Sequence, residues 1–385
     1  MANTLTNLIP VLYAALDSVS REMVGFIPAV SHNAAPTQAA KDQTITIPIA
    51  PAAAAVAISP GLYAPDAGDQ TIEATSITIS KAYQVPVRWN GEEQRGANSG
   101  GYYQQLLQNQ FAQAMRTLVN MVEVDLGALY AGASRAYGAA GTAPFASAGV
   151  LTDVAQMQKI LDDNGAPQSD RSLIINTAAA NLGGVQTSLF KVSEAGTSDL
   201  LRRGIIGELE GFLVGKSRGV AAHTAGAGTG LTINNGTLAV GTTTLTFDGV
   251  TVNSTGYKAG DVIWFNDVTD DKYVVATTTT STTGSLVLTK PGLRSALVND
   301  YHADKAASYA ANLAFSRDAI HLITRLPAMP SGGDCADDVL VITDPVSQLS
   351  FQVAVYRQYR QVKYEIGLAW GCALTKPEHT AILLG

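Results

Sequence analysis

The amino-acid sequence predicts an α+β protein that carries a small β-domain inserted into its chain. Residues 226–290 are rich in Thr and Gly and contain neither Glu nor Arg, which leaves this block with almost no helix-forming character. The chain on either side is rich in Ala and mixes helical with strand patterns, and this mixture resumes near Asn312. A compact β-domain inserted into another domain is the simplest explanation.

Length and composition bound the class of protein. A chain of 385 residues can bury a large core and can hold more than one domain. It is 46% hydrophobic and 15% charged, with a formal net charge of -7. The acidic balance argues against nucleic-acid binding as the main function, because phosphate contacts need an excess of Lys and Arg. So few charges suit a protein that buries surface in an assembly, although a weakly charged monomer would fit too.

Cysteine and hydropathy patterns predict a soluble protein with reduced thiols. Cys335 and Cys372 are the only cysteines, and we interpret them as packing residues of a cytosolic protein. No secretory signal is visible, because the first positive charge is Arg21. The uncharged run 43–65 contains four prolines, which a membrane helix would not tolerate.

The N-terminal stretch 3–24 predicts a short amphipathic helix, interrupted near Pro10. Apolar side chains recur at helical spacing, and charged side chains lie on the opposite side. The apolar positions are Leu12, Ala15, Leu16 and Val19, and the charged ones are Asp17, Arg21 and Glu22. Glycine and prolines from Gly25 to Pro36 then end the helix and begin a loose tract. Such an arm either packs on its own domain or reaches a neighbouring subunit.

Alternating residues predict a long hairpin after the arm. Residues 43–49, 71–80 and 83–89 alternate with period two, and a Pro/Ala-rich stretch, 51–70, separates the first two runs. An isolated two-stranded ribbon is marginally stable in water. We therefore expect the hairpin to lie on another surface, in this subunit or in an adjacent one.

Residues 101–131 predict the longest helix. An apolar stripe runs along it without an interrupting proline. About 30 residues at 1.5 Å rise give a rod of roughly 45 Å, which predicts a spine for other elements. The stripe consists of Leu107, Phe111, Ala114, Met115, Leu118, Val122, Leu126 and Leu129.

The remainder of the chain predicts a small α/β layer, the β-insert and a set of closing strands. The layer comprises a helix at 152–164, a buried strand at 171–176, a helix at 177–189, and a turn and strand at 204–214. Short strands at 244–247, 250–252, 262–265, 273–276 and 286–288 predict a small barrel or sandwich in the insert. The closing strands are 312–315, 319–324, 339–342, 350–356 and 363–374, the last being apolar throughout and hence buried on both faces.

No catalytic, cofactor-binding or metal-binding constellation emerges from the residues. The histidines show no metal-ligand spacing, and we interpret each as a surface or capping residue. They are His32, His223, His302, His321 and His379. Asp267, Asp270 and Asp271 lack the Gly and distal Glu of a calcium loop. A solvated turn is the simplest interpretation, with a cation site or a basic partner across an interface as alternatives. Gly226–Gly230 lacks the ending of a phosphate loop and is interpreted as a linker.

Three stretches resemble the major capsid protein of tailed double-stranded DNA phages, which has the Hong Kong ninety-seven type fold. They are Leu151–Asn176, Gly204–Arg218 and the end of the chain, where Phe315-Ser-Arg-Asp-Ala-Ile-His-Leu-Ile leads to Leu368-Ala-Trp-Gly-Cys-Ala-Leu-Thr-Lys-Pro-Glu378. The order of arm, hairpin, spine helix, α/β layer, insert and closing strands supports the resemblance, which covers nearly the whole chain. The inserted β-barrel domain is similar to that of coat proteins of the Salmonella short-tailed phage type.

The resemblance implies a division of the chain into named parts. They are the N-arm (1–40), the E-loop over the adjacent subunit (41–96), the peripheral domain with the spine helix (97–148), the axial domain (149–222), the inserted β-domain (223–308), the axial return (309–334) and the peripheral closing strands (335–385). Charged residues in three of these parts are our candidate assembly contacts. They are Asp17, Arg21 and Glu22 in the arm, Arg88, Glu92, Glu93 and Arg95 in the E-loop, and Asp270 and Asp271 in the insert.

The resemblance also implies a function and partners. The function is that of a structural, non-enzymatic capsid protein, which self-assembles in the host bacterial cytoplasm into the icosahedral shell of the virion. The implied partners are further copies in hexamers and pentamers, a portal protein, a decoration protein and packaged double-stranded DNA held by weak non-specific contact. A separate scaffolding protein is expected, because the chain starts at the arm. Maturation would use hinges near Gly91 and Gly96. Crosslinking through Lys81 is not expected, because the sequence shows no matched acid.

Other classes stay open at this point. An encapsulin-like nanocompartment shares the fold and would enclose cargo enzymes instead of a genome. A tail or decoration protein would not need the spine helix together with the α/β layer. An enzyme would need a site that the residues do not provide.

Overall fold

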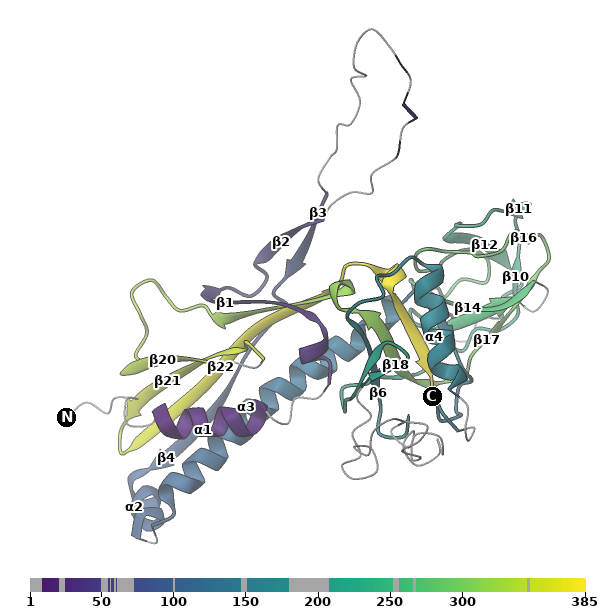
Figure 1. The fold of residues 1–385 in the computed structure, drawn as a ribbon. Coiled ribbons are helices and arrows are strands. Elements are labelled where there is room, and N and C mark those ends of the chain that lie inside the picture. The colour runs from purple at the N-terminus through teal and green to yellow at the C-terminus, as the bar shows by residue number, and fades with distance from the viewer. Residues whose placement is uncertain are drawn as a thin grey trace.

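The computed structural model shows an α+β protein, which confirms the predicted fold class (Figure 1). It describes residues 9–20, 25–49, 55, 57–58, 60, 73–99, 101–146, 151–179, 208–251, 256–265, 268–344 and 347–385. One large sheet packs along the longest described helix, a second large sheet lies beyond the C-terminal end of that helix, and a two-stranded ribbon projects from the body. None of the described helices has the length and apolarity needed to span a bilayer.

The predicted spine is α3 (Tyr103–Gly127), which continues into a short 3-10 helix, η3 (Ala128–Gly132). The apolar stripe is buried from Leu107 to Leu126, as predicted, and Leu129 is partly buried. A separate helix that we did not predict, α2 (Gly91–Ser99), precedes it. The N-terminal helix is α1 (Ile9–Ser20), so Pro10 lies in its first turn, where a missing N–H costs little. Its four predicted apolar residues are buried in the core that α3 shares.

The first sheet has the strand order β1-β19-β22-β21-β20, with β4 paired to β22 as well. Its strands are β1 (Ser31–Ala39), β4 (Lys81–Asn90), β19 (Ile320–Pro327), β20 (Asp338–Thr343), β21 (Ser350–Gln358) and β22 (Gln361–Leu374). The long strand β22 is buried from Tyr364 to Gly371, as its apolar run predicts. The loose tract expected after the arm is wrong for 31–39, because these residues pair in parallel with β19. The register shifts between Ala34 and Gln38, around Pro36.

The second sheet has thirteen strands and passes from the α/β layer into the insert. Its first part contains β5 (Arg135–Tyr137), β6 (Arg171–Ile175), β7 (Glu208–Leu209), β8 (Phe212–Lys216), β9 (Ala222–His223), β18 (Tyr309–Ser316) and β23 (Thr380–Leu384). The helix α4 (Thr152–Asp163) contributes its apolar face to the core on this part. The turn and strand predicted at 204–214 form a tight hairpin between β7 and β8, where Glu210 and Gly211 have positive φ. Most of the helix predicted at 177–189 lies outside the described residues.

The insert forms a nearly closed barrel with its own core, which supports the predicted β-barrel. Its strands run in the order β15-β12-β10-β17-β13-β14, and a bridge between Val275 and Leu288 joins the two ends. They are β10 (Leu231–Ile233), β12 (Thr244–Asp248), β13 (Val262–Phe265), β14 (Thr269–Val274), β15 (Gly284–Val287) and β17 (His302–Lys305). A small flap of β11 (Thr237–Leu238) and β16 (Leu297–Val298) covers one end. Thr251 forms only a single bridge, to Thr229, so the strand predicted at 250–252 is wrong within its described part.

Two of the expected parts of the chain each contribute strands to both sheets. In the range 309–334, β18 lies in the second sheet and β19 in the first. In the range 335–385, the last strand, β23, lies in the second sheet between β5 and β18. Short 3-10 helices complete the fold: η2 (Ile27–Ala29), η5 (Arg317–Ala319) and η6 (Pro377–His379).

Candidate functional site

The projecting ribbon is the first candidate surface. It consists of β2 (Thr44–Ile49) and β3 (Glu73–Thr78), which pair in antiparallel fashion and with no other described strand (Figure 1). Ile45 and Ile47 lie on one face, opposite Ile77 and Thr75, and no charged side chain occurs from Thr44 to Ile49. Two strands cannot bury both faces of a ribbon against each other. The face with Ile45 and Ile77 is partly or fully buried, whereas the other face, which carries Thr, Ser and Pro side chains, is exposed. The ribbon therefore presents a polar and largely uncharged surface, with Glu73 at the first position of β3.

The base of the ribbon is fastened to the first sheet. Ile79 is buried with Ala39 and Ala369 in a small core of their own. At Gly371 on β22, an added Cβ would collide with the carbonyl oxygen of Thr78, so only glycine permits this close approach. The ribbon thus leaves the body of the protein from a fixed point.

The candidate contacts assigned to the E-loop lie away from the ribbon. Arg88 is on β4, and Glu92, Glu93 and Arg95 are on α2, at the opposite end of the molecule (Figure 1). All four are exposed. Glu93 accepts a hydrogen bond from the backbone N–H of Asn90, whose side chain accepts one from Glu93 N–H. This reciprocal pair caps the start of α2. In the arm, Asp17 is exposed on α1, whereas Arg21 and Glu22 lie outside the described residues.

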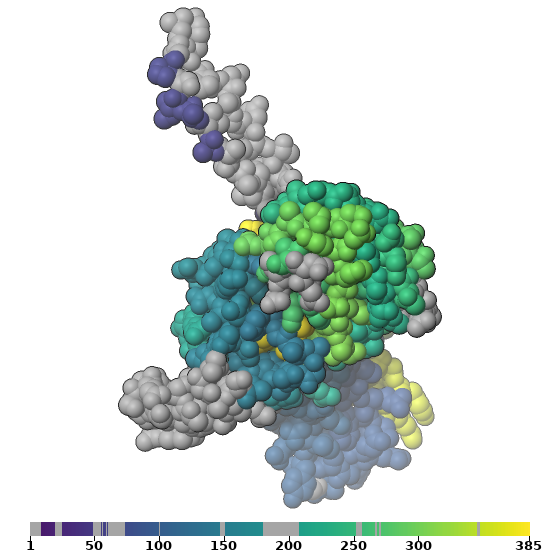
Figure 2. All heavy atoms as spheres, turned by 90° about the vertical axis from the view of Figure 1, so that its right-hand side faces the viewer, coloured from purple at the N-terminus to yellow at the C-terminus, as the bar shows by residue number. Residues whose placement is uncertain are grey.

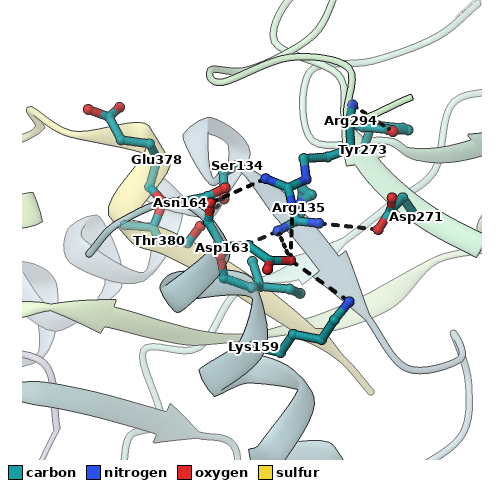
Figure 3. Close-up of polar contacts among 11 residues, drawn as sticks. Ser134, Arg135, Lys159, Asp163, Asn164, Asp271, Tyr273, Arg294, Glu378 and Thr380 are labelled. Atoms are coloured by element: carbon teal, nitrogen blue, oxygen red, sulfur yellow. Dashed lines mark hydrogen bonds and ion pairs between the residues drawn. The ribbon is translucent and has the colours of Figure 1, made fainter. Parts of the chain in front are cut away.

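The second candidate is a buried junction that joins the barrel to the rest of the second sheet. Strand β14 of the barrel pairs with β5, and Lys272 and Tyr273 lie opposite Ala136 and Arg135. Figure 3 shows the Arg135 side chain between carboxylates from two elements. Its Nη1 donates to Asp271 on β14 at 3.2 Å, and its Nη2 donates to Asp163 at the end of α4 at 3.1 Å. The side chain of Arg135 is only 2% exposed.

These contacts correct the interpretation of the acidic turn in the insert. Thr269–Val274 is a strand, and Asp271 pairs within the chain with Arg135, so it is no solvated turn residue. The side chain of Asp270 lies outside the described part of the structure, as does Asp267. Within the described residues, no group of three or more His, Cys, Asp or Glu could hold a metal ion.

Further cations neutralise the Asp163 end of the junction. Arg294, from the barrel, approaches the Asp163 carboxylate to 3.4 Å, and Lys159 lies one helical turn earlier at 3.8 Å. Burial alone would raise the pKa of Asp163, but the hydrogen bond from Arg135 and the charge of Arg294 hold it below its ordinary value. The adjacent Asn164 donates to Ser134 and to the carbonyl of Glu378 (Figure 3). The C-terminal region is thus tied into the same junction.

A second buried cluster fastens the barrel at its entry, and it corrects our interpretation of His223 as a surface residue. His223 is buried, with Nε2 2.8 Å from Asp261 Oδ1 and Nδ1 2.8 Å from the Tyr130 hydroxyl. Asp261 is fully buried and also accepts hydrogen bonds from the backbone N–H groups of Gly226 and Lys258. Burial would raise the pKa of Asp261, but these donors lower it.

Two further expectations concern Lys81, at the base of the ribbon, and the two cysteines. Lys81, for which the sequence shows no matched acid, forms an ion pair with Asp125 at 2.6 Å. The other oxygen of Asp125 accepts a hydrogen bond from Trp370 Nε1 at 2.8 Å. Cys335 is exposed and so is no packing residue, whereas Cys372 is partly buried, which raises the pKa of its thiol to about 11.

The barrel and the α4 region pack side by side and form one continuous face of the molecule (Figure 2). Sequence reasoning missed the residues that hold this face together, Arg135 and His223. Arg135 lies 136 residues from Asp271, and His223 lies 38 from Asp261. The only local hint is that Arg135 lies in the short segment that follows the spine helix.

Comparisons with known proteins give structural relatives only. No protein-family model and no curated protein matches the chain. Among solved structures, the chain is similar to the capsid of the cyanophage P-SCSP1u, with 13% identity over 93% of this chain and 87% of that chain, at a TM-score of 0.44. The capsid of Myoviridae phage XM1 shows 12% identity over 94% and 90%, at 0.43. A virus-like particle from Pyrococcus furiosus shows 10% identity over 97% and 98%, at 0.42.

Proposed function

We propose that this chain is a shell protein, which assembles with copies of itself into an icosahedral capsid around double-stranded DNA. The observation that carries the proposal is the projecting β2–β3 ribbon. It leaves the body from a fixed base and presents an exposed, largely uncharged face of Thr, Ser and Pro side chains that its own two strands cannot cover. In an assembly of identical copies, a neighbouring subunit can supply the surface that covers the ribbon.

The arrangement suits a contact that closes into rings. A ribbon on one part of the molecule that lies on a different part of the next copy is a heterologous contact, and such contacts generate rings when the rotation closes. Many weak contacts of this kind add up to a stable shell through multivalency. The buried junction at Arg135 and the cluster at His223 would keep barrel and sheet in one orientation in every subunit.

The net charge of -7 suits the proposed relation to packaged DNA. An acidic chain would line a shell that encloses DNA without binding it tightly. A scaffolding protein, a portal protein and a decoration protein are the further partners that we propose. The virion is the proposed location of the assembled protein.

Electron microscopy of the full chain tests the proposal. The chain is produced alone and also purified as particles from infected cells. We expect closed or aberrant shells in the first sample and DNA-filled shells in the second. Shells filled with protein in place of DNA would favour a cargo compartment, and a small uniform oligomer in both samples would overturn the shell proposal.

A single substitution on the ribbon sharpens the test. Thr46→Lys places a charge on the exposed face, and because Thr46 is exposed in the free chain, the unassembled chain should unfold at the same denaturant concentration. The yield of particles should fall by about tenfold or more, as expected when an interface must bury an unpaired charge. Ile47→Lys places the same charge on the other, partly buried face of the ribbon and shows which face is covered on assembly.

A further inference from the structure

A groove of about 650 Å³ runs along one side of the spine helix. It lies between α3, the end of α1, the start of β4 and the segment after β8. Its floor is apolar, with Val119, Met121 and Val124 among the lining residues. Its rim carries four cationic side chains, Lys81, Arg116, Lys216 and Arg218, and Glu123 and Asp125 are the only carboxylates among the described residues that line it.

Both carboxylates of the groove already have partners. Glu123 is 8% exposed and accepts hydrogen bonds from the backbone N–H groups of Phe26 and Ile27 and from the Ser217 hydroxyl. Asp125 pairs with Lys81. An added Cβ at Gly219 would lie 2.5 Å from the carbonyl oxygen of Glu123, so the segment after β8 rests directly on the helix. The floor of the groove is therefore preformed.

Two rim cations have no acidic partner among the residues that the structure describes. Ser217 points inward to Glu123, so its neighbours Lys216 and Arg218 point outward, and both are exposed. Neither side chain forms an ion pair with any residue that the structure describes. A preformed apolar groove with unmatched positive charge on its rim fits an acidic segment with small side chains.

The chain itself carries such a segment, the loop 331–337 with the first residue of β20. It reads Ser-Gly-Gly-Asp-Cys-Ala-Asp-Asp and is mostly exposed. Tyr356 donates to Asp334 at 2.6 Å, and Arg357 pairs with Asp337 at 3.3 Å, so two contacts hold the loop in place. The loop carries three carboxylates and no cationic residue of its own, so its sequence is acidic. The loop leads into β20, the edge strand of the first sheet (Figure 1), and none of its residues lines the groove of its own chain.

We propose that the acidic loop 331–338 of one copy docks into the cationic groove of the next copy. The inference rests on the proposed shell function and names one of its contacts. Loop and groove are different surfaces, so the contact is heterologous and links copies head to tail around a ring. Charge complementarity at the rim fixes which copy pairs with which, and the small loop residues fit the apolar floor.

Disulfide trapping tests the contact, because the loop carries the exposed thiol of Cys335. The variant Arg218→Cys places a second thiol on the groove rim. In assembled particles under mild oxidation, we expect a ladder of covalent oligomers on a non-reducing gel, at least about tenfold above that of the controls, since only thiols held close together pair efficiently. The controls are Arg218→Cys with Cys335→Ser, and Lys290→Cys, which places a thiol on an exposed barrel residue.

Charge reversal gives an independent readout. Arg218→Asp alone and Asp337→Arg alone should each lower particle yield by about tenfold or more, and the combined variant should recover most of it. A loss with Arg218→Asp and none with Asp337→Arg would mean that another acidic protein fills the groove, and would overturn the proposal. Shells with neither ladder nor charge effect would also overturn it while leaving the shell function intact. No shells from the unaltered chain would instead remove the proposed function.

Discussion

The guanidinium of Arg135 and the carboxylate of Asp271 lie 3.2 Å apart across the line where the barrel joins the second sheet. Asp163 approaches the same guanidinium from α4, so one buried cation joins three elements. Pairing offsets the cost of burying this charge only while both carboxylates stay in place. The joint should therefore respond sharply to the loss of any of the three side chains.

Replacing Arg135 should be the most damaging change at this joint. Arg135→Met removes the buried cation that Asp163 and Asp271 share, so the free energy of unfolding should fall by about 3–5 kcal/mol. Arg294→Met is the control, because Arg294 pairs with the same Asp163 but is 36% exposed, and it should cost about 1 kcal/mol or less. Urea unfolding of the unassembled chain measures both. Equal losses would show that the burial of Arg135 does not increase its contribution to the free energy of unfolding.

Two glycines on the spine side of the molecule should respond oppositely to alanine. At Gly127, near the end of α3, an added Cβ would collide with the carbonyl oxygen of Gly219. Gly127→Ala should therefore destabilise the chain by about 1–3 kcal/mol through overpacking.

At Gly96 in α2, nothing lies within 4 Å of the added Cβ. Gly96→Ala should stabilise the chain by about 0.5–1 kcal/mol, because alanine favours helix. Thermal unfolding compares the two variants. Our expected hinge near Gly96 adds a second readout, since a stiffer α2 should slow any maturation of particles; unchanged maturation would count against a hinge there.

Acid should loosen the barrel entry through Asp261. Folding lowers the pKa of Asp261, so the unfolded chain binds more protons as the pH falls. The stability that this carboxylate contributes is present above its unfolded pKa of about 3.9 and is lost as the pH falls through the lower folded value.

Asp261→Asn should remove that contribution. The variant should be less stable than the original chain at pH 7, and the gap should narrow below about pH 4. Urea unfolding at a series of pH values measures the gap, with Asp300→Asn, at an exposed turn, as control. A gap that stays constant down to pH 2 would contradict the assignment.

The hydrogen bonds that Glu123 accepts beneath the groove, from Phe26, Ile27 and Ser217, should depend on its negative charge. Glu123→Gln keeps the size of the side chain but turns one acceptor into a donor, which faces a backbone N–H or the Ser217 hydroxyl. We expect a loss of about 1–3 kcal/mol, the cost of leaving a buried group without its partner. Glu92→Gln on the exposed start of α2 should change stability by less than about 0.5 kcal/mol. Similar losses of stability for both variants would argue against a structural role for the hydrogen bonds to Glu123.

Elements whose signal is local could be predicted from the sequence. The helical stripe from Leu107 to Leu126 and the apolar run of β22 depend on periodicity within one segment, and both form where predicted. Strand β1 contains His, Asn, Gln and Pro and has no strand pattern of its own. It forms because β19, nearly 300 residues away, offers an edge with which it pairs in parallel.

Less of the candidate site could be predicted, because most of its contacts join residues that are far apart in the sequence. The ribbon could be predicted because Thr44–Ile49 alternates, and its lack of a core follows from its length. The partners of Arg135 and His223 come from distant parts of the chain, so the neighbouring residues in the sequence do not identify these partners. Only the fold brings these charges together, and each is tolerated inside because its partners arrive with it.

The shared hydrogen bonds between β14 and β5 have a consequence for any chain that lacks the insert. Removing the barrel would uncover the backbone edge of β5, a template for unwanted pairing between chains. It would also leave Arg135 without Asp271. A chain without the barrel would need another side chain at position 135, and another segment would have to cover the edge of β5 before the chain could stay in solution. The barrel is thus an integral wall of the second sheet, and its loss would be an aggregation hazard.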